Sequence, residues 1–228
     1  MSEFLDTYRT YLPEWWGRLC AAVGVTIELS TLGFALAILL GTALVLMIRS
    51  RWRFARLAAN AFVQFLRAVP LLALLLALYF GLPSFGVTLS SFWAGATGLG
   101  LQGSAYVAEV LRGGLGAIHR GQREAGLAAG LPPHKVFLWI VLPQALRIML
   151  PPLLNCYVSL LKDSSLCALI ATDELMLTAR AMSSEFFLPL HIFLLVGLFY
   201  FAIAFPLSML SRLMAQRLSR GRRSVGVV

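Results

Sequence analysis

The chain has 228 residues, of which 59% are hydrophobic, and its formal net charge is +9. Soluble domains contain roughly 45–50% apolar residues, so this composition indicates a membrane protein, in which Lys and Arg gather in cytoplasmic loops. The three cysteines are odd in number and show neither paired nor metal-type spacing, which argues against a disulfide scaffold or a zinc site. We therefore expect no nucleic-acid partner, no metal and no cofactor.

Five long apolar runs predict five transmembrane helices. A helix needs ~20 apolar residues to cross the hydrocarbon core, and only helices or closed barrels satisfy the backbone in lipid. The runs are continuous rather than alternating, which favours helices over a barrel. We expect an all-α integral membrane protein, one domain over 1–228, with helices at about 19–48, 56–80, 92–111, 148–171 and 187–210.

Basic residues are divided unevenly between the two sides of this arrangement. Most of the 19 Lys and Arg residues follow span one, lie between spans three and four, or belong to the C-terminal tail with Arg222 and Arg223. Most acidic residues, including Glu14 and Asp173, fall on the other side. An excess of Lys and Arg marks the cytoplasmic side, so we expect the N-terminus outside and the C-terminus in the cytoplasm.

The segment 112–147, between spans three and four, is the longest connection and predicts a docking element. Residues 121–131 are rich in Ala, Leu, Gln and Glu, and we expect a helix there that Pro132 and Pro133 stop. Apolar residues resume at 136–142 before Pro143. A helix–turn–helix at the cytoplasmic surface is the expected structure.

Ionisable and polar residues inside the spans are candidates for a substrate pathway, because charge in hydrocarbon generally faces a cavity or a partner. Each has a structural alternative. Arg67 could snorkel or clamp the bundle, and Glu109 could pair with Arg112. Lys162 and Asp163 could form ion pairs with other helices. The candidates for a substrate pathway or an intramembrane polar network are Arg67, Gln102, Glu109, Lys162, Asp163, Ser164 and Ser165.

Several motifs together resemble the permease subunits of ATP-binding-cassette (ABC) importers of the polar amino acid type, over nearly the whole chain. Residues 65–72 resemble the family's Phe-x-Arg-Gly-Thr-Pro-Leu-Leu, with Ala68-Val69 in place of Gly-Thr. Residues 105–113 resemble its Ala-Tyr-x-x-Glu-x-x-Arg-Gly, and 161–166 its Leu-Lys-Asp-Thr/Ser-Ser-Leu. Residues 124–143 resemble its docking (EAA) motif, with Gly126 in place of the second Ala.

The resemblance implies a type I importer permease that is not itself an enzyme, with a cytoplasmic coupling loop at 112–147. It implies that a polar amino acid or related compound crosses the bacterial inner membrane. The implied partners are ABC ATPase subunits that use the ATP, an external solute-binding protein, and a second permease subunit, identical or homologous. The implied docking residues are Glu124, Ala125, Gly126, Gly130, Ile140, Leu142 and Pro143.

Two features of the docking motif have a physical rationale. Gly126 and Gly130 place side-chain-free positions four residues apart, which would let the backbone of the partner approach closely. Glu124 is expected in the first turn of its helix, where a carboxylate stabilises the N-terminus and could pair with an Arg of the ATPase. A P-loop requires a Lys after Gly, and neither Lys135 nor Lys162 follows one, so the ATPase should be a separate chain.

The alternative function is a stand-alone carrier or channel driven by an ion gradient, in which the charged membrane residues would be ion-coupling sites. A membrane enzyme has less support, since the chain lacks a Gly-x-Ser-x-Gly elbow and a His-Glu-x-x-His motif.

Overall fold

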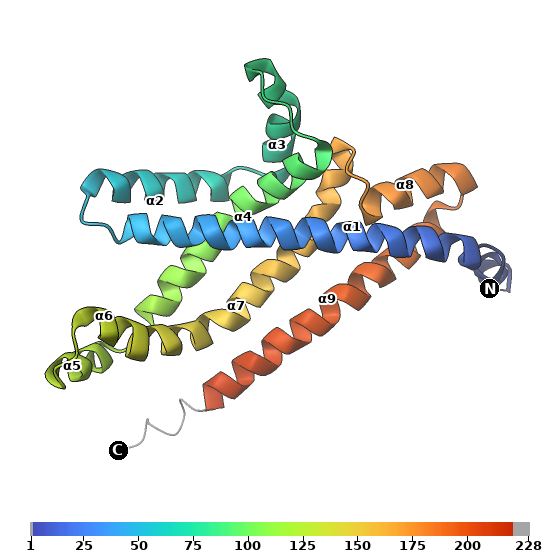
Figure 1. The fold of residues 1–228 in the computed structure, drawn as a ribbon. Coiled ribbons are helices and arrows are strands. Elements are labelled where there is room, and N and C mark those ends of the chain that lie inside the picture. Colours follow the sequence, from blue (N-terminus) through green and yellow to red (C-terminus); the bar gives the residue numbers. More distant parts are fainter. Residues whose placement is uncertain (1, 221–228) are drawn as a thin grey trace.

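The computed structural model describes residues 2–220, and every regular element in that range is helical (Figure 1). This confirms the all-α prediction. The basic residues Arg222 and Arg223 of the predicted cytoplasmic tail lie outside the described range. The α-helices are α1 (Ser2–Ile48), α2 (Arg53–Ala68), α3 (Leu71–Leu76), α4 (Ser91–Gly116), α5 (Arg120–Ala128), α6 (Pro133–Lys135), α7 (Leu142–Asp163), α8 (Leu175–Phe186) and α9 (Pro189–Arg220). Tighter or wider turns occur at η1 (Ala77–Gly81), η2 (Leu82–Phe85), η3 (Val136–Val141) and η4 (Ser164–Ile170).

Three helical stretches within residues 2–220 are long and apolar enough to cross a membrane: Phe4–Ile48, Pro133–Ile170 and Pro189–Leu218. A fourth crossing is reached if the bent pair Arg53–Ala68 and Leu71–Phe85 counts as one span. The remaining predicted span, 92–111, coincides with α4, whose Gly, Ser, Gln and Glu residues lower its hydropathy. The structure therefore has a helix at each predicted position, of which three or four meet the length and hydropathy requirement.

The second predicted span is broken, so the prediction of one continuous helix over 56–80 is wrong. The α2 and α3 segments meet at 104°, and Val69 between them has extended backbone angles (φ −81, ψ 128). Pro70 explains the break, because proline lacks a backbone donor and disfavours helical geometry in the residue before it.

The α4 helix packs closely along α1, because glycines allow the two backbones to approach. A Cβ added to Gly41 of α1 would lie 2.9 Å from the carbonyl oxygen of Ser104 and 2.7 Å from a methyl carbon of Val107. A Cβ added to Gly33 would lie 2.9 Å from the Cβ of Leu99. Helices in lipid associate through such small-residue packing rather than through the hydrophobic effect. The α1–α4 contact is therefore a principal interface of the bundle.

A buried carboxylate just before α8 holds the start of that helix in place. Glu174 precedes α8 and accepts hydrogen bonds from the backbone N–H groups of Met176 and Leu177, each at 2.9 Å. It also accepts one from the Tyr200 hydroxyl of α9 at 2.9 Å, and Thr26 of α1 accepts from the first N–H of α8 at 3.1 Å. These bonds satisfy orphan donors at the helix start, and they join α8 to α1 and α9.

Substitution of Gly41 by Ala tests the α1–α4 contact. We expect the variant to lose roughly 1–3 kcal/mol of stability, because the new methyl group meets backbone that cannot move aside easily. The matched control is Gly24→Ala on the same helix, where an added Cβ meets nothing within 4 Å. Thermal unfolding in one detergent measures both, and equal transition temperatures for the two variants would contradict the packing argument.

Candidate functional site

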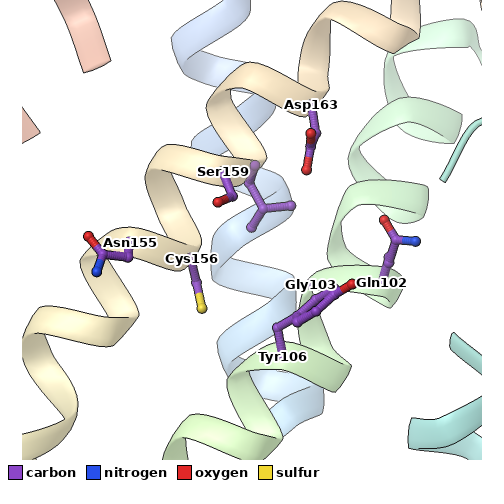
Figure 2. A pocket seen from close by; sticks show the side chains of 8 residues that line it. Gln102, Gly103, Tyr106, Asn155, Cys156, Ser159 and Asp163 are labelled. Atoms are coloured by element: carbon purple, nitrogen blue, oxygen red, sulfur yellow. The ribbon is translucent and has the colours of Figure 1, made fainter. Parts of the chain in front are cut away.

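A cavity of about 370 Å³ lies between α4 and α7 (Figure 2). Polar groups from both helices line it, in a region where the surrounding surface is mainly apolar. Such a combination of apolar walls and a few polar groups is typical of small-molecule sites. The lining residues are Gln102, Gly103 and Tyr106 of α4 and Asn155, Cys156, Ser159, Leu160 and Asp163 of α7.

The polar lining follows one face of each helix. Asn155, Ser159 and Asp163 are spaced four residues apart on α7, and Gln102 and Tyr106 are spaced four apart on α4; residues at this spacing share a helix face. Gln102 and Asp163 were predicted from the sequence, whereas Tyr106, Asn155 and Ser159 were not. The missed signal is the repeat of polar residues every four positions along an apolar helix.

Gln102 joins the cavity to the break between α2 and α3. Its side-chain Nε2 donates a hydrogen bond of 2.9 Å to the carbonyl oxygen of Val69. That carbonyl lies at the break that Pro70 imposes, and an unpaired carbonyl away from water is costly. Gln102 therefore stabilises the bend while it lines the cavity.

Arg67 and Glu109 meet one another, but they do not line this cavity. The Arg67 Nη1 atom is 4.0 Å from Glu109 Oε1, and Glu109 also pairs with Arg112 one turn further along α4. The side chains are partly exposed, so each pair contributes only about 0–1 kcal/mol. The predicted pairing of Glu109 with Arg112 is confirmed, and Arg67 connects α2 to α4.

Three of the remaining pathway candidates, Lys162, Ser164 and Ser165, do not line the cavity. The Ser164 hydroxyl donates to the carbonyl oxygen of Leu161 and the Ser165 hydroxyl to that of Lys162, both at 2.7 Å. Lys162 is exposed. Among residues 2–220, neither Lys162 nor Asp163 forms an ion pair with another helix. Of the four polar residues predicted at 162–165, only Asp163 lines the cavity.

The predicted loop helix exists, but a glycine ends it before the prolines. The His119 Nδ1 atom accepts a hydrogen bond from the Gly121 N–H at 3.1 Å and caps the start of α5. At the other end, Gly130 has a φ of +79° and Leu131 donates to the Gly126 carbonyl at 3.2 Å. This is the glycine-based helix end that left-handed backbone permits. The predicted end at residue 131 is corrected to Ala128.

The expected role of Gly126 is wrong, because this residue faces its own chain. It is buried, and an added Cβ would lie 2.7 Å from Ile140 Cδ1 and 3.0 Å from Val136 Cγ2. Gly126 thus lets α5 pack against η3 and gives a partner no access to its backbone. Gly130 has open space around a Cβ position, so its backbone conformation explains the glycine.

Glu124 also differs in position from the expectation. It is the fifth residue of α5, beyond the first turn, and it is exposed. It forms no ion pair with a basic group of residues 2–220. Glu124 therefore lies on the side of α5 opposite the buried Gly126, and Ala125 and Leu127, which flank Gly126 in the sequence, are exposed as well.

The second half of the motif forms the wall against which α5 packs. Ile140 is half-buried and faces Gly126, whereas Leu142 begins α7 and Pro143 follows it at the surface. Gln144 donates to the Ile140 carbonyl at 2.7 Å and to the Gln122 side chain at 3.3 Å. The two halves of the motif therefore form a hairpin that is continuous with α7.

Substitution of Gly126 by Ala tests the hairpin. We expect faster amide hydrogen exchange throughout α5, because an added Cβ would displace Ile140 and Val136. The control is Gly113→Ala at the end of α4, where an added Cβ meets nothing within 4 Å. Unchanged amide hydrogen exchange in α5 of Gly126→Ala would mean that Gly126 is not packed tightly against Ile140 and Val136.

Comparisons with known proteins agree with this arrangement. Residues 21–223 match the family described as "Binding-protein-dependent transport system inner membrane component". The chain is 32% identical over 220 residues, 96% of this chain and 98% of the relative, to the probable glutamine ABC transporter permease protein GlnM of Bacillus subtilis (strain 168). It is 35% identical over 188 residues, 82% of this chain and 81% of the relative, to the probable amino-acid ABC transporter permease protein y4tG of Sinorhizobium fredii (strain NBRC 101917 / NGR234).

A solved structure has the same fold. The crystal structure of an amino acid ABC transporter with histidines contains a chain that superimposes with a TM-score of 0.85 at 28% identity, covering 91% of this chain and 97% of that one. Sequence and structure therefore lead to the same conclusion: the chain belongs to the inner membrane components of binding-protein-dependent transport systems, and it is a non-catalytic permease subunit of an ABC importer.

Proposed function

We propose that this permease carries a polar amino acid or a related compound through the cavity between α4 and α7, and that the α5 hairpin receives the force that drives the cycle. The observation that carries the proposal is continuity: α4 and α7 line the cavity, and the hairpin joins the C-terminal end of α4 to the N-terminal end of α7. The amino acid transport stated in the names of the relatives supports the substrate class.

The proposed topology has five spans, with the N-terminus outside and the C-terminus in the cytoplasm. The α5–α6 hairpin and the end of α9 lie toward one end of the molecule, and α8 and the start of α1 lie toward the other (Figure 1). This separation supports the orientation inferred from the uneven distribution of Lys and Arg in the sequence. The α4 helix is proposed as a span despite its low hydropathy, because much of its surface packs against other helices and does not need to face lipid.

The proposed docking surface is the outward face of the hairpin. Glu124 and Ala125 lie exposed on α5, Gly130 ends that helix, and Pro143 is exposed at the start of α7. We assign Gly126 and Ile140 the task of shaping this surface from within, and Leu142 that of connecting it to α7. A partner Arg could pair with Glu124, which is unpaired within the described chain.

The proposed substrate site contains both a negatively charged group and neutral hydrogen-bond donors. The carboxylate of Asp163 suits an ammonium group, and the amides of Gln102 and Asn155 can donate to a carboxylate. The cavity volume lies within the usual range for small ligands, ≈ 300–1,000 Å³. Ser164, Ser165 and Lys162 are assigned to the framework rather than to the substrate, and Arg67 and Glu109 to the connection between α2 and α4.

The proposed cycle is mechanical. Closure of two ATPase subunits on ATP would move both docking hairpins, one on this chain and one on an identical or homologous second permease. Because α5 packs on η3, and η3 continues into α7, the hairpin would carry α7 with it. Rigid-body motion of this kind opens one side of a transporter and closes the other. An external solute-binding protein would deliver the substrate.

Substitution of Glu124 by Arg tests docking. We expect the ATP-binding subunit to be lost from the tagged, purified chain, because the reversed charge would repel the proposed Arg of the partner, while membrane insertion stays normal. The control is Glu14→Arg, an equal charge change on an exposed residue at the opposite end. Normal recovery of the ATP-binding subunit with the Glu124 variant would refute the docking role.

Substitution of Asp163 by Asn tests the substrate site. We expect uptake of a panel of radiolabelled polar amino acids into proteoliposomes to fall at least tenfold, about 1.4 kcal/mol, because the ammonium partner is lost. The ATP-binding subunit should still co-purify. Asp6→Asn is the control, since Asp6 is an exposed carboxylate outside the cavity. Wild-type uptake by the Asp163 variant would exclude this carboxylate from the pathway.

A further inference from the structure

A second cavity, of about 310 Å³, lies beside the α5 hairpin and is separate from the proposed substrate site. Three arginines line it: Arg49, which follows the last residue of α1, and Arg120 and Arg123 of α5. His119, the cap of α5, lines it as well. The cavity thus brings together basic groups from two segments that are about 70 positions apart in the sequence.

The positive charge of this cavity is not balanced by the described chain. No Asp or Glu lines it, and none of the three guanidinium groups has a carboxylate of residues 2–220 within 4.0 Å. Guanidinium groups are well suited to phosphate, because their donors match its oxygens in pairs. A cluster of this kind favours an anionic ligand with several acceptor oxygens.

The surroundings of the cavity indicate an amphipathic ligand. Leu115, Ile118 and Val141 lie in its wall beside the arginines. The last turn of α1, which leads to Arg49, exposes Leu46 and Met47. The cavity therefore adjoins a surface that would face lipid, at the level where a membrane helix ends.

We propose that this cavity binds the phosphate headgroup of an anionic phospholipid from the cytoplasmic leaflet, which bridges the end of α1 and the α5 hairpin. The proposal rests on the orientation given under the proposed function, since that leaflet carries the anionic lipids that basic cavities between membrane helices attract. A headgroup held by Arg49, Arg120 and Arg123 would fix the hairpin relative to α1. The occupancy of the cavity would then set the position of the docking surface.

Native mass spectrometry of the full chain, purified with the subunits that accompany it, tests this proposal. The protein is incubated with phosphatidylglycerol or with phosphatidylcholine of the same acyl chains. We expect retention of one phosphatidylglycerol per chain, a preference of at least tenfold over phosphatidylcholine, and loss of that preference in Arg49→Gln. The control Arg51→Gln removes the same charge two residues away, outside the cavity, and should retain the preference.

A second variant, Arg120→Gln, removes a cavity arginine from α5 and leaves the α1–α2 turn unchanged. It should also lose the preference for phosphatidylglycerol if the cavity, and not a local change in that turn, is responsible. Thermal unfolding without added lipid shows whether the variants remain folded. Equal phosphatidylglycerol retention by the wild type, Arg49→Gln and Arg120→Gln would overturn the proposal. Competition by inorganic phosphate at a concentration equal to that of the lipid would overturn it in favour of a soluble phosphate.

The outcome is distinguishable from a failure of the proposed docking function. If Arg49→Gln and Arg120→Gln release the ATP-binding subunit but keep the lipid preference, the cavity belongs to the ATPase interface and the lipid proposal fails. If Glu124→Arg leaves the ATPase bound while Arg49→Gln loses the lipid, docking at Glu124 is wrong and the lipid site stands.

Discussion

The close contact between α1 and α4 is the interaction on which the rest of the structure depends. Water is absent from the hydrocarbon core, so burial of apolar groups does not by itself bring helices together there. Gly33 and Gly41 instead let the two backbones approach closely, so that α1 packs against the middle part of α4, from Ala96 to Val107. With α4 fixed on α1, an adjacent face of α4 lines the cavity and its C-terminal end leads into the hairpin.

Where a proline breaks a membrane helix, a side chain of a neighbouring helix hydrogen-bonds a backbone carbonyl at the break. Gln102 bonds the carbonyl of Val69 beside the break at Pro70. The α7 helix, by contrast, continues through Pro151 and Pro152, and the Ser211 hydroxyl of α9 donates to the Pro151 carbonyl at 2.9 Å, which joins α9 to α7. Proline in a membrane helix is tolerated when neighbours supply such bonds. The break at Pro70 lies beside the cavity, because Gln102 both bonds the Val69 carbonyl and lines the cavity.

Sequence reasoning located the membrane helices because apolar composition is a property of each segment alone. It also located the hairpin, since its motif has a fixed spacing. It missed the bend at Pro70 although the proline was visible, because a run of apolar residues is interpreted as one span. The packing of Gly126 against its own chain was not predictable from the sequence. Two glycines four residues apart predict a helix face without side chains, but they do not show which surface that face contacts. Asn155 and Ser159 were missed because each is unremarkable singly, and only their register with Asp163 indicates a common face.

The central claim is that this permease moves solute only when ATP is used by a separate subunit and solute is presented from outside. Uptake into proteoliposomes containing the purified complex, measured with each component supplied or withheld, tests that claim most directly. The account predicts uptake that requires both internal ATP and the external solute-binding protein, and none with an imposed proton or sodium gradient alone. Uptake by this chain alone, driven by an ion gradient without ATP, would contradict the account and favour an ion-coupled carrier.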